Sequence, residues 1–168
     1  MEAHNRDLVW WWKILWKLKC PGKAKLFFWA ILENKAPTWD ILQKRFLQGP
    51  GICSLCRDAE ETISHLFVHC RYSQAVWADI CKYLDYNVRW QGESILEAFY
   101  LWCSDQKVSS IRVFPCIFAW GIWITRNKIR FHDCRVLMET VVVQAVAIIQ
   151  HFKEPVKAIE FRPVHETD

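Results

Sequence analysis

The chain has 168 residues, of which 52% are hydrophobic and 24% are charged, and its formal net charge is +4. This length and composition allow one globular domain, or one domain with an added lobe, and they exclude a disordered chain. The longest apolar stretch, residues 113–124, is shorter than the ~20 residues of a membrane-spanning helix, so we expect no membrane span. The polar opening residues 1–7 predict no signal peptide.

Helical patterns fill the first half of the chain. The break between the first two helices falls at Pro21-Gly22. Asp7 is placed to cap the first helix and Thr38 to cap the third. Apolar residues at helical spacing predict helices over residues 7–19, 23–34, 39–47, 60–70 and 72–84.

Three consecutive tryptophans, Trp10, Trp11 and Trp12, stand in the first of these helices. Successive helical residues turn by about 100°, so the three rings cannot all face one core. We expect at least one of them to face solvent, a partner or another part of the protein.

The second half of the chain is also helical in pattern. Ser94 is placed to cap a helix over 95–103, and Pro115 lies in the first turn of a long helix expected over 110–130. Arg126, Lys128 and Arg130 near the end of that helix are placed to favour its dipole. The last helix is expected from residue 135 or 137 to residue 152.

These patterns predict a mainly α protein in three parts. The parts are a domain of residues 1–84, a C-terminal helical region of residues 85–152 packed on it, and a flexible tail of residues 153–168. A polar connection over residues 85–93 marks the boundary between the first two parts.

The cysteines divide into two groups. Five are scattered among apolar neighbours, and we expect them to be reduced core thiols of a nuclear or cytoplasmic protein: Cys20, Cys81, Cys103, Cys116 and Cys134. The other three share a short segment with a histidine in the pattern C-x2-C-x8-H-x4-C, formed by Cys53, Cys56, His65 and Cys70.

That segment predicts a zinc site. Three sulfurs and one imidazole can close a tetrahedral shell around one Zn²⁺, which leaves no open position for catalysis and makes the ion structural. The alternative is a set of buried thiols beside a surface histidine. The turn-forming Gly49-Pro50-Gly51 before Cys53 favours the metal site. His69 is a rival ligand, but its position directly before Cys70 leaves its ring little freedom to share an ion with that residue.

Several motifs occur in the order of a known family. In sequence letters they are WKLKCP at 16–21, KAKLFFW at 23–29, APT at 36–38, and CSLC, ET, HLF, C and VW between 53 and 77. Together these segments, within residues 10–80, resemble the zinc-binding domain that follows the reverse transcriptase in plant LINE-type (non-LTR) retrotransposons. The segment WGIWITRN at 120–127 resembles an element found downstream in such reading frames.

The resemblance implies zinc ligands at Cys53, Cys56, His65 and Cys70 in a chain derived from a retroelement. The chain contains no adjacent pair of aspartates, which the polymerase would need for its metal ions, and no strand-borne carboxylate cluster of a ribonuclease H. We therefore expect the connecting region of such an element without either enzyme. No local signature of a cysteine nucleophile or of a zinc deaminase occurs.

The expected function is that of a non-enzymatic module with one structural zinc ion that binds RNA or DNA. Residues 1–50 hold nine Lys or Arg against four Asp or Glu, a net +5, whereas the remaining residues hold thirteen against fourteen, a net −1. A solvated helix face would give the same excess. The expected contact residues are Lys13, Lys17, Lys19, Lys23, Lys25, Lys44, Arg45, Trp11 and Trp12.

The alternative function is a co-opted adaptor that binds a host protein, or a second copy of itself, through tryptophan-rich apolar surfaces. Neither function involves a membrane or a small-molecule substrate. Salt dependence separates them, because phosphate contacts weaken steeply with salt and apolar docking does not.

Overall fold

The computed structural model describes residues 9–155, and apart from one isolated β-bridge every regular element in that range is a helix, which confirms the mainly α prediction. The elements are α1 (Trp10–Lys17), α2 (Gly22–Leu32), α3 (Trp39–Lys44), a π-helical turn (His65–His69), α4 (Arg71–Leu84), α5 (Ile95–Ser104), a 3-10 helix (Gln106–Ile111), α6 (Phe114–His132) and α7 (Met138–Phe152). Within residues 9–155, no helix combines the length and the apolar character needed to cross a bilayer.

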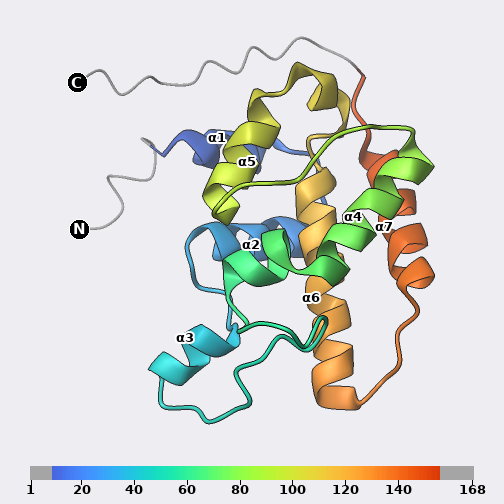
Figure 1. The fold of residues 1–168 in the computed structure, drawn as a ribbon. Coiled ribbons are helices and arrows are strands. Elements are labelled where there is room, and N and C mark those ends of the chain that lie inside the picture. Colours follow the sequence, from blue (N-terminus) through green and yellow to red (C-terminus); the bar gives the residue numbers. More distant parts are fainter. Residues whose placement is uncertain (1–8, 156–168) are drawn as a thin grey trace.

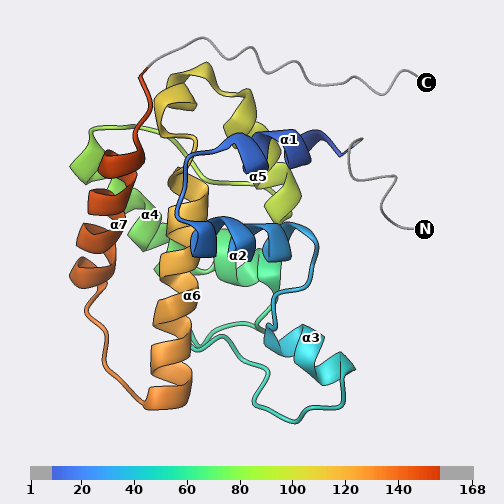
Figure 2. The same cartoon turned by 180° about the vertical axis from the view of Figure 1, so that it is seen from behind.

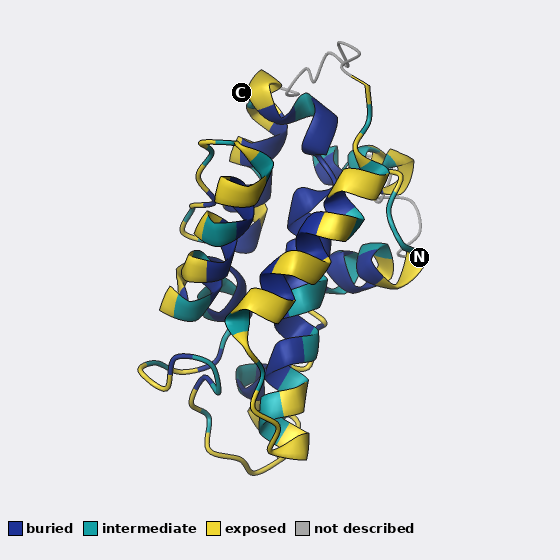
Figure 3. Ribbon diagram, turned by 90° about the vertical axis from the view of Figure 1, so that its right-hand side faces the viewer, coloured by how far each residue is buried: buried dark blue, intermediate teal, exposed yellow. Residues whose placement is uncertain are grey.

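The long helix α6 stands at the centre of the fold (Figure 1). It packs against α2 and α7, and α4 packs against α7. Seen from behind, α1 and α5 lie together at one end of the molecule, whereas α3 and the loop after it lie at the other end (Figure 2). Buried residues line the inward faces of the helices (Figure 3). One continuous buried cluster runs from Trp11 to Ile149 and includes helices on both sides of residue 84. The division into two domains at that residue stays a prediction.

Trp77 of α4 is the centre of the aromatic core. Its ring is stacked between Phe114 of α6, with centroids 3.8 Å apart, and Trp90 of the connection, with centroids 5.0 Å apart. The edges of Trp102 and Phe118 meet it at 5.2 and 5.1 Å. Each aromatic pair adds about 0.5–1.5 kcal/mol beyond the burial of its area. This cluster therefore fixes the irregular residues 85–93 against α4.

The predicted helix starts in the second half are largely confirmed. The Ser94 hydroxyl accepts a hydrogen bond from the Glu97 N–H at 3.2 Å, so Ser94 caps α5. The Glu97 carboxylate accepts one from the Glu93 N–H at 2.9 Å, which satisfies a second donor at this helix end. Pro115 lies in the first turn of α6 as predicted. That helix begins later than expected, at Phe114, because the residues before it form the 3-10 helix.

The predicted caps in the first half have different outcomes. Asp7 lies outside the described residues, and Val9 occupies the N-cap of α1. Thr38 occupies the N-cap of α3 as predicted, but its hydroxyl donates to the Asp40 carboxylate at 2.5 Å instead of accepting from the helix backbone. The first N–H of α3, that of Trp39, donates instead to the Glu61 carboxylate at 3.1 Å.

The three consecutive tryptophans point in different directions, as helix geometry predicts. Trp11 is buried in the core. Trp10 is half-buried and packs on Phe99 of α5, with ring centroids 5.7 Å apart. Trp12 is half-buried beside Trp16, at 5.4 Å between centroids.

All eight cysteines are free thiols. Cys81, Cys103 and Cys116 are buried and Cys20 is half-buried, in agreement with the predicted core positions. The prediction is wrong for Cys134, whose side chain is exposed. Its position explains the difference, because α6 ends at His132 and the chain then leaves the helical body before α7 begins.

Candidate metal centre

A short hairpin supplies the first two cysteines of the predicted site. Ile52 and Glu60 form an antiparallel bridge, and the Cys53 N–H donates to the Ala59 carbonyl at 2.9 Å. Between these residues the chain closes a tight turn in which the Arg57 N–H donates to the Cys53 carbonyl, also at 2.9 Å. Arg57 adopts a left-handed backbone conformation with φ 59°. The turn folds the hairpin around the two thiols, which are both buried.

The π-helical turn supplies the other two side chains. In an α-helix, five residues advance about 500°, so positions 65 and 70 would point in directions roughly 140° apart. The Cys70 N–H instead donates to the carbonyl of His65, five residues earlier, at 2.7 Å. Such a widened turn, whose hydrogen bond spans five residues instead of four, brings the two side chains closer to one side. The predicted helix over 60–70 is therefore present only in part, and its π-helical turn is what orients His65 and Cys70.

The four predicted ligand atoms converge on one point. They all lie within 4.8 Å of one another, with Cys53 Sγ 3.9 Å from Cys70 Sγ and Cys56 Sγ 3.2 Å from His65 Nε2. Zinc bonds of ~2.3 Å to sulfur require sulfur–sulfur separations of about 3.8 Å in a tetrahedral shell. The donor set, its spacing and its burial therefore fit Zn²⁺. A zinc ion here cross-links the hairpin to the π-helical turn and keeps no open position for a reactant.

The thiols of Cys53 and Cys70 form a hydrogen bond with each other. The hydrogen bond between them lowers the pKa of Cys70 to about 5 and, together with burial, raises that of Cys53. Zinc binds thiolates, and the lowered pKa of Cys70 favours that form of the ligand.

Polar contacts hold the hairpin from outside. The Asp58 N–H lies 3.5 Å from Cys56 Sγ and donates to it. Arg71, at the start of α4, donates to the Cys56 carbonyl at 3.1 Å and forms an exposed ion pair with Asp58 at 3.0 Å. These contacts orient Cys56 toward His65.

His69, the rival ligand, lies elsewhere. Its side chain is exposed, and its Nε2 is 2.8 Å from the carbonyl of Gly92 in the connection. The imidazole that meets the thiols is that of His65.

A buried ion pair next to the metal centre was not found by the sequence analysis. Glu61 follows the hairpin and is 0% exposed, and Arg126 of α6 is 1% exposed. Arg126 Nε donates to one oxygen of Glu61 at 2.9 Å and Nη2 to the other at 2.5 Å. The expectation that Arg126 serves the dipole at the end of α6 is therefore wrong, because its guanidinium binds Glu61 in the core. Both residues belong to quoted motifs, yet no signal in the sequence indicates that they pair.

The predicted contact cations are mostly on the surface. Lys25 is half-buried, and its Nζ donates to the carbonyl of Trp16 at 3.3 Å. The other six are exposed: Lys13, Lys17, Lys19, Lys23, Lys44 and Arg45. Of the two predicted contact tryptophans, Trp12 is half-buried and Trp11 is buried at 4% exposure. Trp11 therefore has no free ring face for a partner, because its side of α1 packs into the core.

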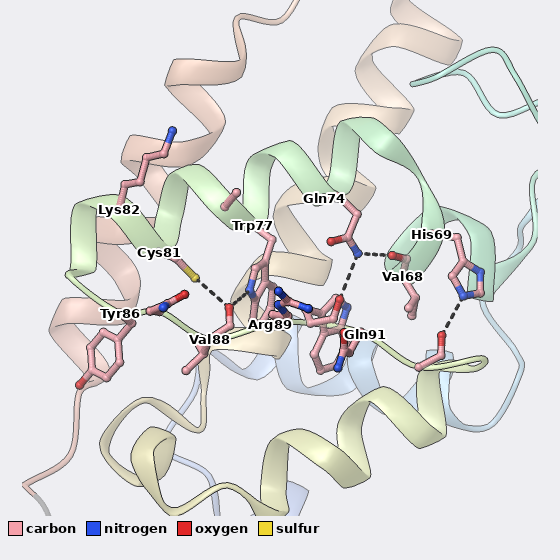
Figure 4. A pocket seen from close by; sticks show the side chains of 14 residues that line it. Val68, His69, Gln74, Trp77, Cys81, Lys82, Tyr86, Val88, Arg89 and Gln91 are labelled. Carbon is pink, nitrogen blue, oxygen red and sulfur yellow. Dashed lines mark hydrogen bonds between the residues drawn. The ribbon is translucent and has the colours of Figure 1, made fainter.

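A groove of about 670 Å³ lies between α4 and residues 86–92 (Figure 4). Apolar groups of Trp77 and Val88 line it, and His69, Lys82 and Arg89 supply basic groups. No carboxylate lines it. This lining suits an anionic or neutral ligand better than a cation. Sequence analysis could not find the groove, because it depends on how the connection runs back along α4.

Comparisons with known proteins agree with this geometry. Residues 1–77 match the family described as zinc-binding in reverse transcriptase. Over 125 residues, the chain is 23% identical to an Arabidopsis thaliana protein that is named as a ribonuclease H protein. That alignment covers 73% of this chain and 20% of the relative, so the chain spans about a fifth of the relative's length. No solved structure matches the chain. Residues 1–77 therefore match the zinc-binding domains of reverse transcriptases, and Cys53, Cys56, His65 and Cys70 are placed to bind one structural zinc ion.

Proposed function

We propose that this zinc-organised protein is a non-enzymatic module that binds nucleic acid. The observation that carries the proposal is the charge of its first third. Residues 9–50 contain eight Lys or Arg and two Asp or Glu, and six of the cations that we predicted as contacts are exposed. Phosphates bind such a surface by releasing condensed counterions.

The non-enzymatic part of the proposal rests on the metal centre. Four protein ligands would fill the tetrahedral shell of a zinc ion, so the ion would cross-link the chain and would not activate a water. None of the eight cysteines, all of them among the described residues, forms a disulfide, which supports function in the nucleus or the cytoplasm, where thiols stay reduced.

The adaptor alternative receives less support. That alternative depends on exposed tryptophans. Among the described residues, Trp16 is the only tryptophan whose side chain is exposed, at 38%, and six of the others are buried. Two exposed apolar side chains remain on α1 and α2, Trp16 and Leu26. Docking of a protein there is the outcome that the following experiment separates from nucleic-acid binding.

The test is a salt titration with a fluorescently labelled single-stranded oligonucleotide and the full chain. We expect the affinity to fall steeply between ~50 and ~200 mM salt. Neutralising Lys13, Lys17 and Lys23 together by alanine should reduce the salt slope by about two, at ~0.7 per phosphate contact on a single strand. The matched control replaces three exposed lysines outside this surface, Lys107, Lys128 and Lys153, and should leave the slope unchanged. An affinity that does not respond to salt would contradict the proposal.

A further inference from the structure

Phe46 occupies an unusual position directly after α3. Its side chain is 95% exposed, and its backbone is left-handed, with φ 62°. The Phe46 N–H donates to the Gln43 carbonyl at 3.0 Å and the Leu47 N–H to the Leu42 carbonyl at 3.1 Å. These two bonds form a Schellman motif with Phe46 at the left-handed position, which glycine takes most often because it has no Cβ.

The ring therefore contributes nothing to the fold that explains its presence. A bulky residue with positive φ is a backbone outlier, and such outliers concentrate at functional sites. Burial would offset the strain, but the Phe46 ring is almost wholly in solvent. An aromatic side chain therefore stands where both the backbone conformation and the exposure to solvent disfavour it.

The surroundings of Phe46 combine apolar and basic groups. We call Lys44, Arg45, Phe46, Leu47 and Ile52 the α3 tip. Leu47 and Ile52 are also exposed, as are Lys44 and Arg45. Residues 41–57 contain three cations, the third being the exposed Arg57 of the zinc turn, and no carboxylate.

Two contacts hold the backbone of the α3 tip in place. The Ile52–Glu60 bridge joins it to the hairpin of the metal centre. Gly49 passes so close to Trp39 that a Cβ there would overlap the indole ring. The tip lies at the end of the molecule opposite α1 and α5 (Figures 1 and 2), and exposed residues fill this region (Figure 3).

The chemistry of this tip favours nucleic acid over protein. Protein interfaces have apolar cores from which lysine is depleted, and they need about 800 Å² on each partner. One ring flanked by cations instead fits a nucleobase with phosphates on either side, since every base offers a π-face and base–aromatic stacking tolerates any sequence. Bases in a duplex are already stacked on one another, so the tip suits an unpaired base.

We propose that the α3 tip binds single-stranded nucleic acid, with one unpaired base stacked on the Phe46 ring and the adjoining phosphates contacted by Lys44, Arg45 and Arg57. This inference rests on the proposed function and adds to it a base-binding contact, away from Lys13, Lys17 and Lys23, whose expected contacts are to phosphates further along the strand. Zinc then has an indirect role, because it holds the hairpin that carries one side of the tip.

The test is the substitution Phe46→Gly in the full chain, with affinity measured by fluorescence anisotropy on a labelled single-stranded oligonucleotide. Glycine relieves the left-handed backbone, so the Tm should stay unchanged or rise by a few degrees while the affinity falls roughly ten-fold. Phe46→Tyr keeps a stacking ring and should bind as the natural protein does. The control is Tyr83→Ala, which removes an exposed aromatic ring from α4 and should leave the affinity unchanged.

The possible failures are distinguishable. If the natural protein does not bind the oligonucleotide, the proposed function itself is wrong. If it binds and Phe46→Gly binds equally well, the function stands and the α3 tip is excluded as its site. A fully paired duplex that binds as tightly as the single strand, with the same loss in Phe46→Gly, would overturn the assignment of an unpaired base.

Discussion

The helical body and the zinc-bearing end of this protein are stabilised in different ways. In the body, α2, α4, α6 and α7 bury apolar and aromatic side chains against one another, with Trp77 in contact with four other rings. At the other end, residues 42–52 are almost all exposed. The conformation of that segment therefore depends on the metal centre, on the Glu61–Arg126 ion pair and on a few hydrogen bonds.

Because of this contrast, we expect substitutions to destabilise the two regions in different ways. Apolar burial is spread over many side chains, so the body loses stability gradually when one of them is shortened. A four-ligand metal site has no such redundancy, since losing one ligand opens the shell. Glu61 and Arg126 join the two regions, because the first leaves the hairpin and the second lies in α6.

The largest effect is expected from Cys56→Ser. A structural zinc site contributes on the order of 10 kcal/mol of apparent binding free energy, and this substitution removes one of its four ligands. We expect zinc content to fall and amide hydrogen exchange to accelerate first over residues 48–72, while α6 and α7 keep their protection. Zinc analysis and exchange mass spectrometry of the same sample measure both.

Two variants sharpen this result. Cys134→Ser removes an exposed thiol outside the centre and should change neither zinc content nor exchange. Trp77→Ala should cost about 4 kcal/mol of the whole fold and leave the zinc bound in the protein that remains folded. A Cys56→Ser protein with full zinc content and an unchanged Tm would show that the centre is not what organises this end.

A smaller effect is expected at the joint between the regions. Glu61→Gln leaves Arg126 buried without its counter-charge, which should cost about 3 kcal/mol of unfolding free energy in urea titrations. Adding Arg126→Met removes the unpaired charge and should recover part of the loss. The exposed pair of Asp58 and Arg71 is the control, and Asp58→Asn should cost no more than ~1 kcal/mol. Equal costs for Glu61→Gln and Asp58→Asn would contradict the role of the buried pair.

The smallest effect concerns the thiols of the helical body. Burial raises the pKa of Cys103 to about 12 and that of Cys81 to about 11, so both are almost fully protonated at pH 8. A thiol reagent should therefore label the exposed Cys134 rapidly and these two only after unfolding. Because their pKa values exceed the 9.0 of the unfolded chain, the stability they contribute is complete below pH 9 and is lost as pH rises toward 12. Labelling of Cys103 as fast as Cys134 would refute this burial.

The sequence predicted those features that depend on near neighbours. The four metal-binding side chains lie within eighteen residues, and Ser94 and Pro115 mark helix starts through local hydrogen bonding and backbone geometry. Periodicity was sufficient for the helices of the body. The π-helical turn was not predicted, because its pattern of apolar residues is close to that of an α-helix.

Features that depend on tertiary contacts could not be predicted. Glu61 and Arg126 are separated by 65 positions, and each alone has the character of a surface residue. The burial of Trp11 follows from which side of α1 faces the core, and the exposure of Cys134 and Phe46 follows from where α6 and α3 end. Sequence periodicity does not settle that choice when apolar residues surround the position.

The Glu61–Arg126 pair also sets a limit on how this protein can be divided. The part that matches the zinc-binding family ends at residue 77, whereas the guanidinium that neutralises its innermost carboxylate comes from position 126. An excised fragment ending after α4 would keep the acid and lose the base, so its interior would hold an uncompensated negative charge. A fragment designed for expression therefore has to include α6. The same holds for any transfer of the zinc-binding part to another protein.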